Sequence, residues 1–259
     1  MIPVCLTIAG SDPSGGAGIQ ADLKTFHRHG VYGAAAITLI TVQNTRGVES
    51  VHLLDPDLVA AQVRSVLDDL PVAVIKTGAL GNAAIAIALV GTLRKRAIPL
   101  ILDPVMVSKH GAPLMAPTEV SGIVDSLFPL ARLVTPNLPE AEVILGRKIE
   151  GLEQQRRAAR DLLDRTGCQA ALVKGGHAEG DEVFDVLWDG RRMHEVRAKR
   201  LETPHTHGTG CTTASAIAAF LAQGMSLPDA FGAAIDWVHK AIAEAPGIGG
   251  GNGPINHFA

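Results

Sequence analysis

The sequence predicts a doubly wound α/β fold, in which a mostly parallel central sheet carries helices on both faces. Apolar strand-like segments alternate with amphipathic helical segments, which is the pattern of parallel strands joined by crossover helices. Most of the strand-like segments are continuously apolar, as strands buried on both faces are. The pair Asp189-Gly190 is a hairpin signal and predicts an antiparallel pair at one edge of the sheet.

The predicted elements follow one another without a long break. Strands are expected at residues 4–9, 35–42, 73–76, 100–103, 133–135 and 170–174, and the hairpin at 183–188 and 191–196. Helices are expected at about residues 19–29, 57–69, 83–96, 138–145, 153–165, 211–223 and 227–244. We find no internal repeat, polar linker or shift in composition, so we expect a single domain over residues 1–259.

Composition and charge argue against several classes of partner. The chain is 47% hydrophobic and 19% charged, so it has enough apolar residues for a large core. A formal net charge of −3 gives no basic field for nucleic acid, and no apolar stretch approaches the roughly 20 residues of a membrane span. The three cysteines lack zinc or disulfide spacing, and the first residues do not resemble a signal peptide. We therefore expect a cytoplasmic protein with no nucleic-acid or membrane partner.

The segment Thr206-His207-Gly208-Thr209-Gly210-Cys211-Thr212-Thr213 places two glycines directly before an Ala-rich helix. Unpaired N–H groups at such a helix start bind phosphate, helped by the positive end of the helix dipole. A Gly-rich turn that binds nothing is the alternative. Cys211 lies in the first helical turn, where the pKa of a thiol is often lowered, although free cysteines are more often buried apolar residues. His205 and His207 point apart in an extended loop, which does not favour a metal site.

A second Gly-rich segment, residues 10–18, follows the first strand and precedes the first helix. Ligands of open α/β sheets bind at this position, beyond the carboxyl ends of the strands. The segment fits the dinucleotide pattern loosely, but the next strand ends in Gln43-Asn44 without an acidic residue for a ribose, so we reject that interpretation. P-loop and protein-kinase motifs do not occur.

Polar residues also follow three other predicted strands. Asn137 and Glu140 have the spacing of a capping box, or they help to hold Mg²⁺ and phosphates. Lys174 is followed by Gly175 and is either a phosphate ligand or a solvated lysine. Asp103 precedes a proline and is either a carboxylate of the site or a turn residue.

Several long motifs, taken in order, resemble the hydroxymethylpyrimidine/phosphomethylpyrimidine kinases of thiamine biosynthesis, in the ribokinase superfamily. The motifs are residues 9–22 (AGSDPSGGAGIQAD), 43–47 (QNTRG), 76–78 (KTG), 103–106 (DPVM), 135–141 (TPNLPEA), 173–177 (VKGGH), 206–211 (THGTGC) and 253–258 (GPINHF). They span nearly the whole chain, and together they are far more specific than one Gly-rich loop.

The resemblance implies a ribokinase-like homodimer that uses ATP and Mg²⁺ to phosphorylate a hydroxymethylpyrimidine and then its monophosphate. The pyrimidine pocket would contain Gly10, Asp22, Gln43, Val105 and Ala79. Position 79 departs from the family pattern, in which a methionine lies against the substrate ring. An aminopyrimidine edge presents donors and acceptors together, which a carboxylate and an amide pair with.

The resemblance also implies the residues that serve the nucleotide and the chemistry. The nucleotide would be bound by Asn137, Glu140, Lys174, Gly175 and Thr209, and Mg²⁺ by Glu140 and Asp103. Catalysis would involve Gly208, Gly210, Cys211 and Lys174. Cys211 stands where sugar kinases of the superfamily carry an aspartate base. Two alternatives remain, a pyridoxal or pyridoxine kinase and a non-catalytic sensor of a vitamin precursor.

Overall fold

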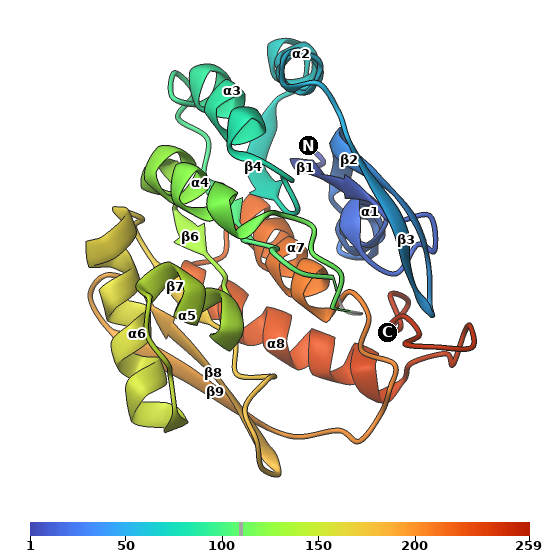
Figure 1. Ribbon diagram of the computed structural model, residues 1–259, viewed down its shortest axis with the longest axis vertical. Coiled ribbons are helices and arrows are strands. Elements are labelled where there is room, and N and C mark those ends of the chain that lie inside the picture. Colours follow the sequence, from blue (N-terminus) through green and yellow to red (C-terminus); the bar gives the residue numbers. More distant parts are fainter. Residues whose placement is uncertain (109–110) are drawn as a thin grey trace.

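A nine-stranded sheet runs through the described residues, 1–108 and 111–259, of the computed structural model (Figure 1). The strand order is β3-β2-β1-β4-β5-β6-β7-β8-β9. The strands are β1 (Val4–Ser11), β2 (Tyr32–Asn44), β3 (Gly47–Leu53), β4 (Val72–Thr77), β5 (Leu100–Leu102), β6 (Leu133–Val134), β7 (Ala171–Val173), β8 (Glu182–Trp188) and β9 (Met193–Lys199). The strands from β2 to β7 in this order are parallel, which confirms the predicted fold class.

Antiparallel strands lie at both edges of the sheet. The predicted hairpin is β8 and β9, and β8 pairs antiparallel with β7. At the other edge β3 pairs antiparallel with β2, a strand that the sequence analysis did not predict. The two strands are joined through Thr45-Arg46, which lacks the Asn-Gly or Asp-Gly signal of a tight hairpin. The turn is stabilised instead by Asn44 Oδ1, which accepts a hydrogen bond from the Arg46 N–H at 2.8 Å.

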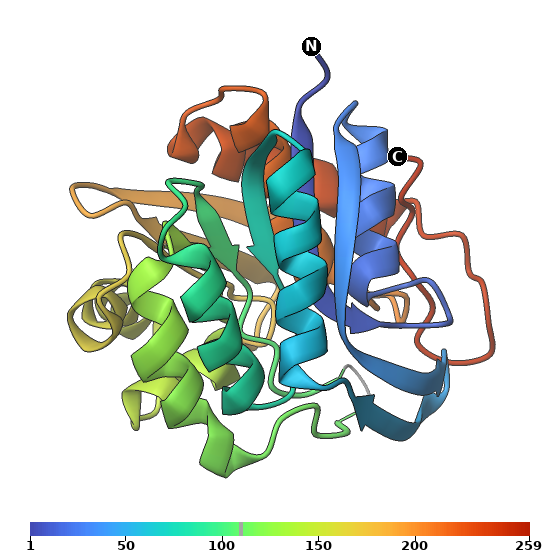
Figure 2. The ribbon, with the colours of Figure 1, turned by 90° about the horizontal axis from the view of Figure 1, so that it is seen from above.

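Helices cover both faces of the sheet, and Figure 2 shows α2, α3 and α4 side by side on one of them. The helices are α1 (Gly18–Arg28), α2 (Pro56–Asp69), α3 (Ala83–Leu93), α4 (Val120–Leu127), α5 (Leu138–Leu145), α6 (Gly151–Thr166), α7 (Thr209–Ala222) and α8 (Leu227–Ala243). Short 3₁₀ turns at Pro117–Glu119 and Phe128–Leu130 flank α4, which was not predicted. One core packs α2 to α6 against the sheet, and a second packs α1, α7 and α8 against the opposite face.

The sheet order places a switch point directly after β1. The chain leaves β1 to form β2 on one side and later returns to form β4 on the other. A loop at such a point faces a crevice, because the neighbouring connections leave in opposite directions. The Gly-rich segment 10–18 therefore lies where a ligand of this fold is expected. No helix in the described part of the chain is long and apolar enough to cross a membrane.

Candidate active site

A cavity of about 740 Å³ opens at the carboxyl edge of the parallel strands. Four of the predicted substrate residues line it, namely Gly10, Gln43, Ala79 and Val105. The predicted residues beyond β5, β6 and β7 also line it: Asp103, Asn137, Glu140 and Lys174. The start of α7 completes the wall with Gly208, Thr209, Gly210 and Cys211. The fold thus brings twelve of the fourteen predicted site residues to one cavity, and the exceptions are Asp22 and Gly175.

Asp22 lies behind the cavity wall, contrary to its predicted place in the pyrimidine pocket. Its side chain and that of Lys76 are both fully buried, and Lys76 Nζ lies 2.8 and 2.9 Å from the two carboxylate oxygens. The hydroxyls of Thr7 and Ser215 each donate to the carboxylate at 2.6 Å. Burial alone would lower the pKa of Lys76, but the Asp22 charge outweighs it and raises the pKa. Asp22 therefore joins β1, α1, β4 and α7 through a buried ion pair.

Gly175, predicted to bind the nucleotide, does not line the cavity either. A Cβ at this position would lie 2.0 Å from the carbonyl oxygen of Phe184, so only glycine allows β8 to pass this close. The Gly175 N–H donates to Asp185 Oδ1 at 2.8 Å. Asp185 lines the cavity and was not predicted, because an acidic residue in a hairpin strand carries no distinctive sequence signal. Burial raises the pKa of this carboxyl group, while the Gly175 N–H and Lys174 oppose the shift.

The N-terminus of α7 has the properties of an anion site. Gly208 precedes the helix with φ 83°, and a Cβ there would lie 1.8 Å from the carbonyl oxygen of Gly16. Glycine is therefore required both by the backbone conformation and by the close approach of the first loop. The N–H groups of Gly210 and Cys211 have no acceptor within residues 1–108 and 111–259. These two donors point out of the helix start, where phosphate oxygens bind.

A cation–carboxylate pair faces the start of α7. Lys174 Nζ lies 2.8 Å from Asp103 Oδ1, which also accepts a hydrogen bond from the Thr135 hydroxyl at 3.0 Å. A Cβ on Gly210 would lie 3.1 Å from the Lys174 ammonium, so glycine keeps this space open. Burial by itself lowers the pKa of Lys174, but Asp103 and then Glu140 reverse the shift and raise it. The Lys174 side chain is only 13% exposed and is paired with Asp103, so it is a mostly buried, positively charged group rather than a solvated surface lysine.

The capping interpretation of Asn137 and Glu140 is confirmed. Asn137 Oδ1 accepts from the Glu140 N–H at 2.9 Å, and Glu140 Oε2 accepts from the Asn137 N–H at 2.9 Å, so α5 begins with a capping box. Burial raises the pKa of Glu140, an effect that Lys174 opposes and Asp103 reinforces. The same carboxyl group accepts a hydrogen bond from the Met106 N–H, which ties the loop after β5 to α5.

Cys211 does not have the lowered pKa that its place in the first helical turn suggested. Burial raises the pKa of this thiol to about 11, although the nearby charge of Lys76 acts in the opposite direction. The Gly18 N–H donates to the sulfur, so the thiol also contacts the start of α1. The helix dipole does not overcome burial here, because the side chain is desolvated between two helix starts.

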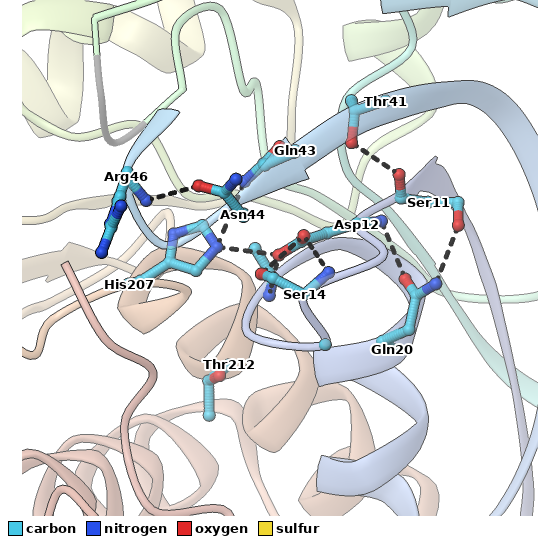
Figure 3. Close-up of polar contacts among 12 residues, drawn as sticks. Ser11, Asp12, Ser14, Gln20, Thr41, Gln43, Asn44, Arg46, His207 and Thr212 are labelled. Carbon is cyan, nitrogen blue, oxygen red and sulfur yellow. Dashed lines mark hydrogen bonds and ion pairs between the residues drawn. The ribbon is translucent and has the colours of Figure 1, made fainter. Parts of the chain in front are cut away.

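Asp12 and His207 form a contact that the sequence analysis did not find (Figure 3). His207 Nε2 lies 2.8 Å from Asp12 Oδ2 and 3.3 Å from Gln43 Nε2, and both Asp12 and His207 are almost fully buried. Asp12 Oδ1 accepts from the N–H and the hydroxyl of Ser14 at 2.9 and 2.7 Å. The sequence Asp12-Pro13-Ser14 predicts such a local turn, but not its contact with a histidine 195 residues away.

Known proteins of similar sequence and structure match this chain over nearly its whole length. The family model for phosphomethylpyrimidine kinase matches residues 12–256. The hydroxymethylpyrimidine/phosphomethylpyrimidine kinase of Synechococcus elongatus is 48% identical, over 99% of this chain and 98% of its own. A phosphomethylpyrimidine kinase structure from Clostridium difficile superposes with TM-score 0.82, at 38% identity, over 93% of this chain and 99% of its own.

A second solved structure is related as closely in its fold. The ADP complex of Bacillus subtilis pyridoxal kinase superposes with TM-score 0.92, at 35% identity, over 100% of this chain and 98% of its own. The ribokinase-like fold expected from the motifs is therefore shared with kinases of two vitamin-type substrates. The family model and the identity over the full length assign the chain to the first of these two groups of kinases. The chain belongs to the phosphomethylpyrimidine kinase family.

Proposed function

We propose that this chain transfers a phosphoryl group from ATP to the hydroxymethyl oxygen of 4-amino-5-hydroxymethyl-2-methylpyrimidine, and a second one to the resulting monophosphate. The observation that carries the proposal is that one cavity has Gln43 on one wall and, on another, Lys174 with the N–H groups of Gly210 and Cys211, which have no acceptor among the described residues. Membership of the family and the order of the motifs give the ring and the reaction. The product is the pyrimidine diphosphate used for thiamine.

The chemistry suits a site built for positioning. In phosphoryl transfer the transition state is loose, and its charge develops on the oxygens of the transferred group and the leaving group. The Lys174 ammonium and the N–H groups of Gly210 and Cys211 are fixed donors for this charge, and they need no reorganisation when it appears. Little deprotonation of the attacking hydroxyl is needed early, so the neutral Cys211 thiol need only orient it.

Mg²⁺ is the metal that this donor set fits. Asp103 is almost fully buried, and its Oδ2 has no hydrogen-bond partner among the residues that the structure describes. Mg²⁺ is usually held by one or two carboxylates together with substrate phosphates and water, rather than by an all-protein cage. Asp103, with Glu140 next to it, would hold the ion, and the ion would neutralise charge on the nucleotide phosphates.

Mass spectrometry of the reaction products tests the proposed function. We expect the purified protein with Mg-ATP to convert the pyrimidine alcohol to the monophosphate and then to the diphosphate, with ADP formed at each step. Lys174→Met should lower the rate of both phosphorylation steps. The absence of both phosphorylated products from folded wild-type protein, with an active kinase of the family run in parallel, would refute the assignment.

A pyridoxal kinase activity is the second candidate. It is favoured by the likeness to pyridoxal kinase structures and by Ala79, a small residue on the cavity wall where the family pattern has methionine. A shorter side chain leaves room for a bulkier pyridine ring. Competition between the two alcohols in one assay compares their values of kcat/KM directly.

We further propose that residues 1–259 act as one kinase domain, in a cytoplasmic homodimer. One continuous sheet supports the single domain. Three free cysteines suit a reducing compartment. Tyr32, Ile40, Val42 and Leu53 expose apolar side chains on β2 and β3, a surface compatible with a second copy. Light scattering of wild type and Val42→Lys tests the dimer, and a monomeric wild type contradicts it.

A further inference from the structure

One ring nitrogen of His207 contacts the side chains of both Asp12 and Gln43 (Figure 3). All three residues line the end of the cavity that we assign to the pyrimidine. His207 Nε2 lies 2.8 Å from a carboxylate oxygen of Asp12 and 3.3 Å from the amide nitrogen of Gln43. A carboxylate needs a donor, whereas an amide NH₂ needs an acceptor. The ring nitrogen carries either a proton, which suits the carboxylate, or a lone pair, which suits the amide NH₂. It cannot satisfy both neighbours at once.

The surroundings of Asp12 decide the competition. The Ser14 N–H and hydroxyl donate to Oδ1, and the Ala17 N–H donates to Oδ2 at 2.9 Å. Burial alone would raise the pKa of Asp12, but the hydrogen bonds from His207 and Ser14 outweigh it and lower the pKa. Asp12 is therefore ionised at neutral pH and accepts only. A proton on His207 Nε2 follows, because a lone pair there would face a carboxylate at 2.8 Å.

A protonated Nε2 requires an acceptor from Gln43. Rotating the amide by 180° exchanges its oxygen and nitrogen without moving the side chain, and it places Oε1 opposite the ring N–H. The NH₂ group is then directed away from His207. Gln43 is half-buried and lines the cavity, so this NH₂ group is available to a ligand.

We propose that Asp12 and His207 are positioning residues that hold the Gln43 amide with its oxygen toward His207 and its NH₂ toward the substrate. Gln43 then determines specificity as a donor, and it recognises a ring nitrogen rather than the amino group of the pyrimidine. This rests on the proposed function, because it takes the pyrimidine to lie beside Gln43. An amide that is free to rotate could present either its oxygen or its NH₂ group to the ligand. By fixing the orientation, the buried pair of Asp12 and His207 makes Gln43 selective for a hydrogen-bond acceptor on the ligand.

Substrate analogues separate the two orientations of Gln43. The set contains the aminopyrimidine alcohol, two analogues with CH in place of either ring nitrogen, and one without the amino group. We expect Gln43→Met to raise KM for the parent alcohol about tenfold, the effect of one lost hydrogen bond of roughly 1.4 kcal/mol. For one of the two CH analogues, Gln43→Met should no longer raise KM. For the analogue without the amino group, Gln43→Met should still raise KM. If the rise in KM disappears only for the analogue without the amino group, the proposal is overturned.

Variants of His207 test the positioning role. His207→Gln can still donate to both neighbours, whereas His207→Leu cannot. We expect His207→Leu to raise KM for the alcohol and to weaken discrimination among the analogues, with KM for ATP unchanged, and His207→Gln to restore most of the discrimination. Equal behaviour of the two variants, both folded by circular dichroism, overturns the role of the Nε2 proton.

Nitrogen-15 NMR of the histidine rings examines the same network without turnover. We expect His207 Nε2 to be protonated in the free protein at pH 7, and an unprotonated Nε2 overturns the proposal directly. If wild-type protein forms no ADP with the pyrimidine alcohol, the proposed function fails, and with it the substrate part of this inference. The NMR result still decides whether the pair orients Gln43.

Discussion

The thiol of Cys211 is uncharged at neutral pH, because burial raises its pKa to about 11. A group of this kind donates or accepts a hydrogen bond, but only a small fraction of it is a thiolate base at pH 7. The same side chain lies at the start of α7, beside the N–H groups of Gly210 and Cys211, where the transferred phosphoryl group is proposed to bind. We therefore propose that Cys211 contributes by orienting the substrate hydroxyl.

Cys211→Ala should lower kcat by about 10²-fold, a typical contribution of a positioned proton-handling group, while KM changes less. Cys211→Ser should retain more activity, because its hydroxyl is also neutral. The wild-type kcat should stay level between pH 7 and 9, since the thiolate fraction is small throughout this range. A kcat that rises tenfold per pH unit would show that the thiolate is the acting species, and a native rate in the alanine variant would leave Cys211 a packing role.

Ala79 predicts a loss of discrimination between rings. It is almost fully buried on the cavity wall, and its carbonyl oxygen accepts from the Thr38 hydroxyl at 2.6 Å, so the backbone there is fixed. Ala79→Met should restore an apolar wall and raise the ratio of kcat/KM for the pyrimidine alcohol over pyridoxine. One methylene in such a pocket changes selectivity by about 1–3 kcal/mol, so the ratio should rise tenfold or more. A falling or constant ratio would show that a neighbouring side chain such as Met106 already fills the space.

At the scale of elements, buried charge connects the helices to the sheet. The ion pair of Asp22 and Lys76 joins α1 to β4, and the hydroxyls of Thr7 and Ser215 extend the network to β1 and α7. The charges of Asp22 and Lys76 also act on the Cys211 thiol, so this network lies close to the start of α7. The relative placement of the four elements fixes where Cys211 and Gly210 face the cavity.

Lys76→Met should destabilise the fold by about 3–5 kcal/mol, because it leaves the fully buried Asp22 charge without its partner. The double variant Asp22→Asn/Lys76→Met should recover much of the loss, since it removes the uncompensated charge. Urea unfolding measures both. Arg96→Met breaks the exposed pair with Asp68 and serves as the control, with an expected midpoint close to wild type. An equal loss in the single and double variants would mean that shape, rather than charge, makes the site necessary.

The start of α5 combines a helix cap with a proposed metal ligand. Glu140→Gln should raise the Mg²⁺ concentration needed for half-maximal rate more than it lowers the melting temperature, because glutamine can still reach the Asn137 N–H but carries no charge. Asp55→Ala is the matched control, since it removes the N-cap of α2 away from the cavity. We expect it to lower the melting temperature by about 2–4 °C with unchanged Mg²⁺ dependence. If Glu140→Gln lowers the melting temperature and leaves the Mg²⁺ dependence unchanged, Glu140 serves only as a helix cap.

The whole molecule explains which features the sequence could predict. Continuous apolar runs identified the parallel strands, and the convergence of their carboxyl ends brought Asp103, Asn137 and Lys174 to one edge. The network around Asp22 was missed because its partner Lys76 lies 54 residues away, and local patterns do not encode pairings across the sheet. The strand β3 was missed because its turn lacks glycine at the two central positions. The features that could not be predicted from the sequence were therefore long-range contacts and an unusual turn, whereas local helix and strand propensities predicted most of the elements.

One cavity contains both the proposed pyrimidine wall and the start of α7, where we propose that phosphate binds, which leads to a prediction for the whole molecule. A bisubstrate ligand that links the pyrimidine methylene to ATP through a phosphate chain should bind more tightly than either part, because the second contact becomes intramolecular. We expect a gain of about 10²-fold over the better single ligand, measured by calorimetry with Mg²⁺ present. Lys174→Met should weaken ATP and the linked ligand, whereas Gln43→Met should weaken the pyrimidine and the linked ligand. If the linked ligand binds no better than ATP, the two subsites are not occupied together, and direct transfer within this cavity is wrong.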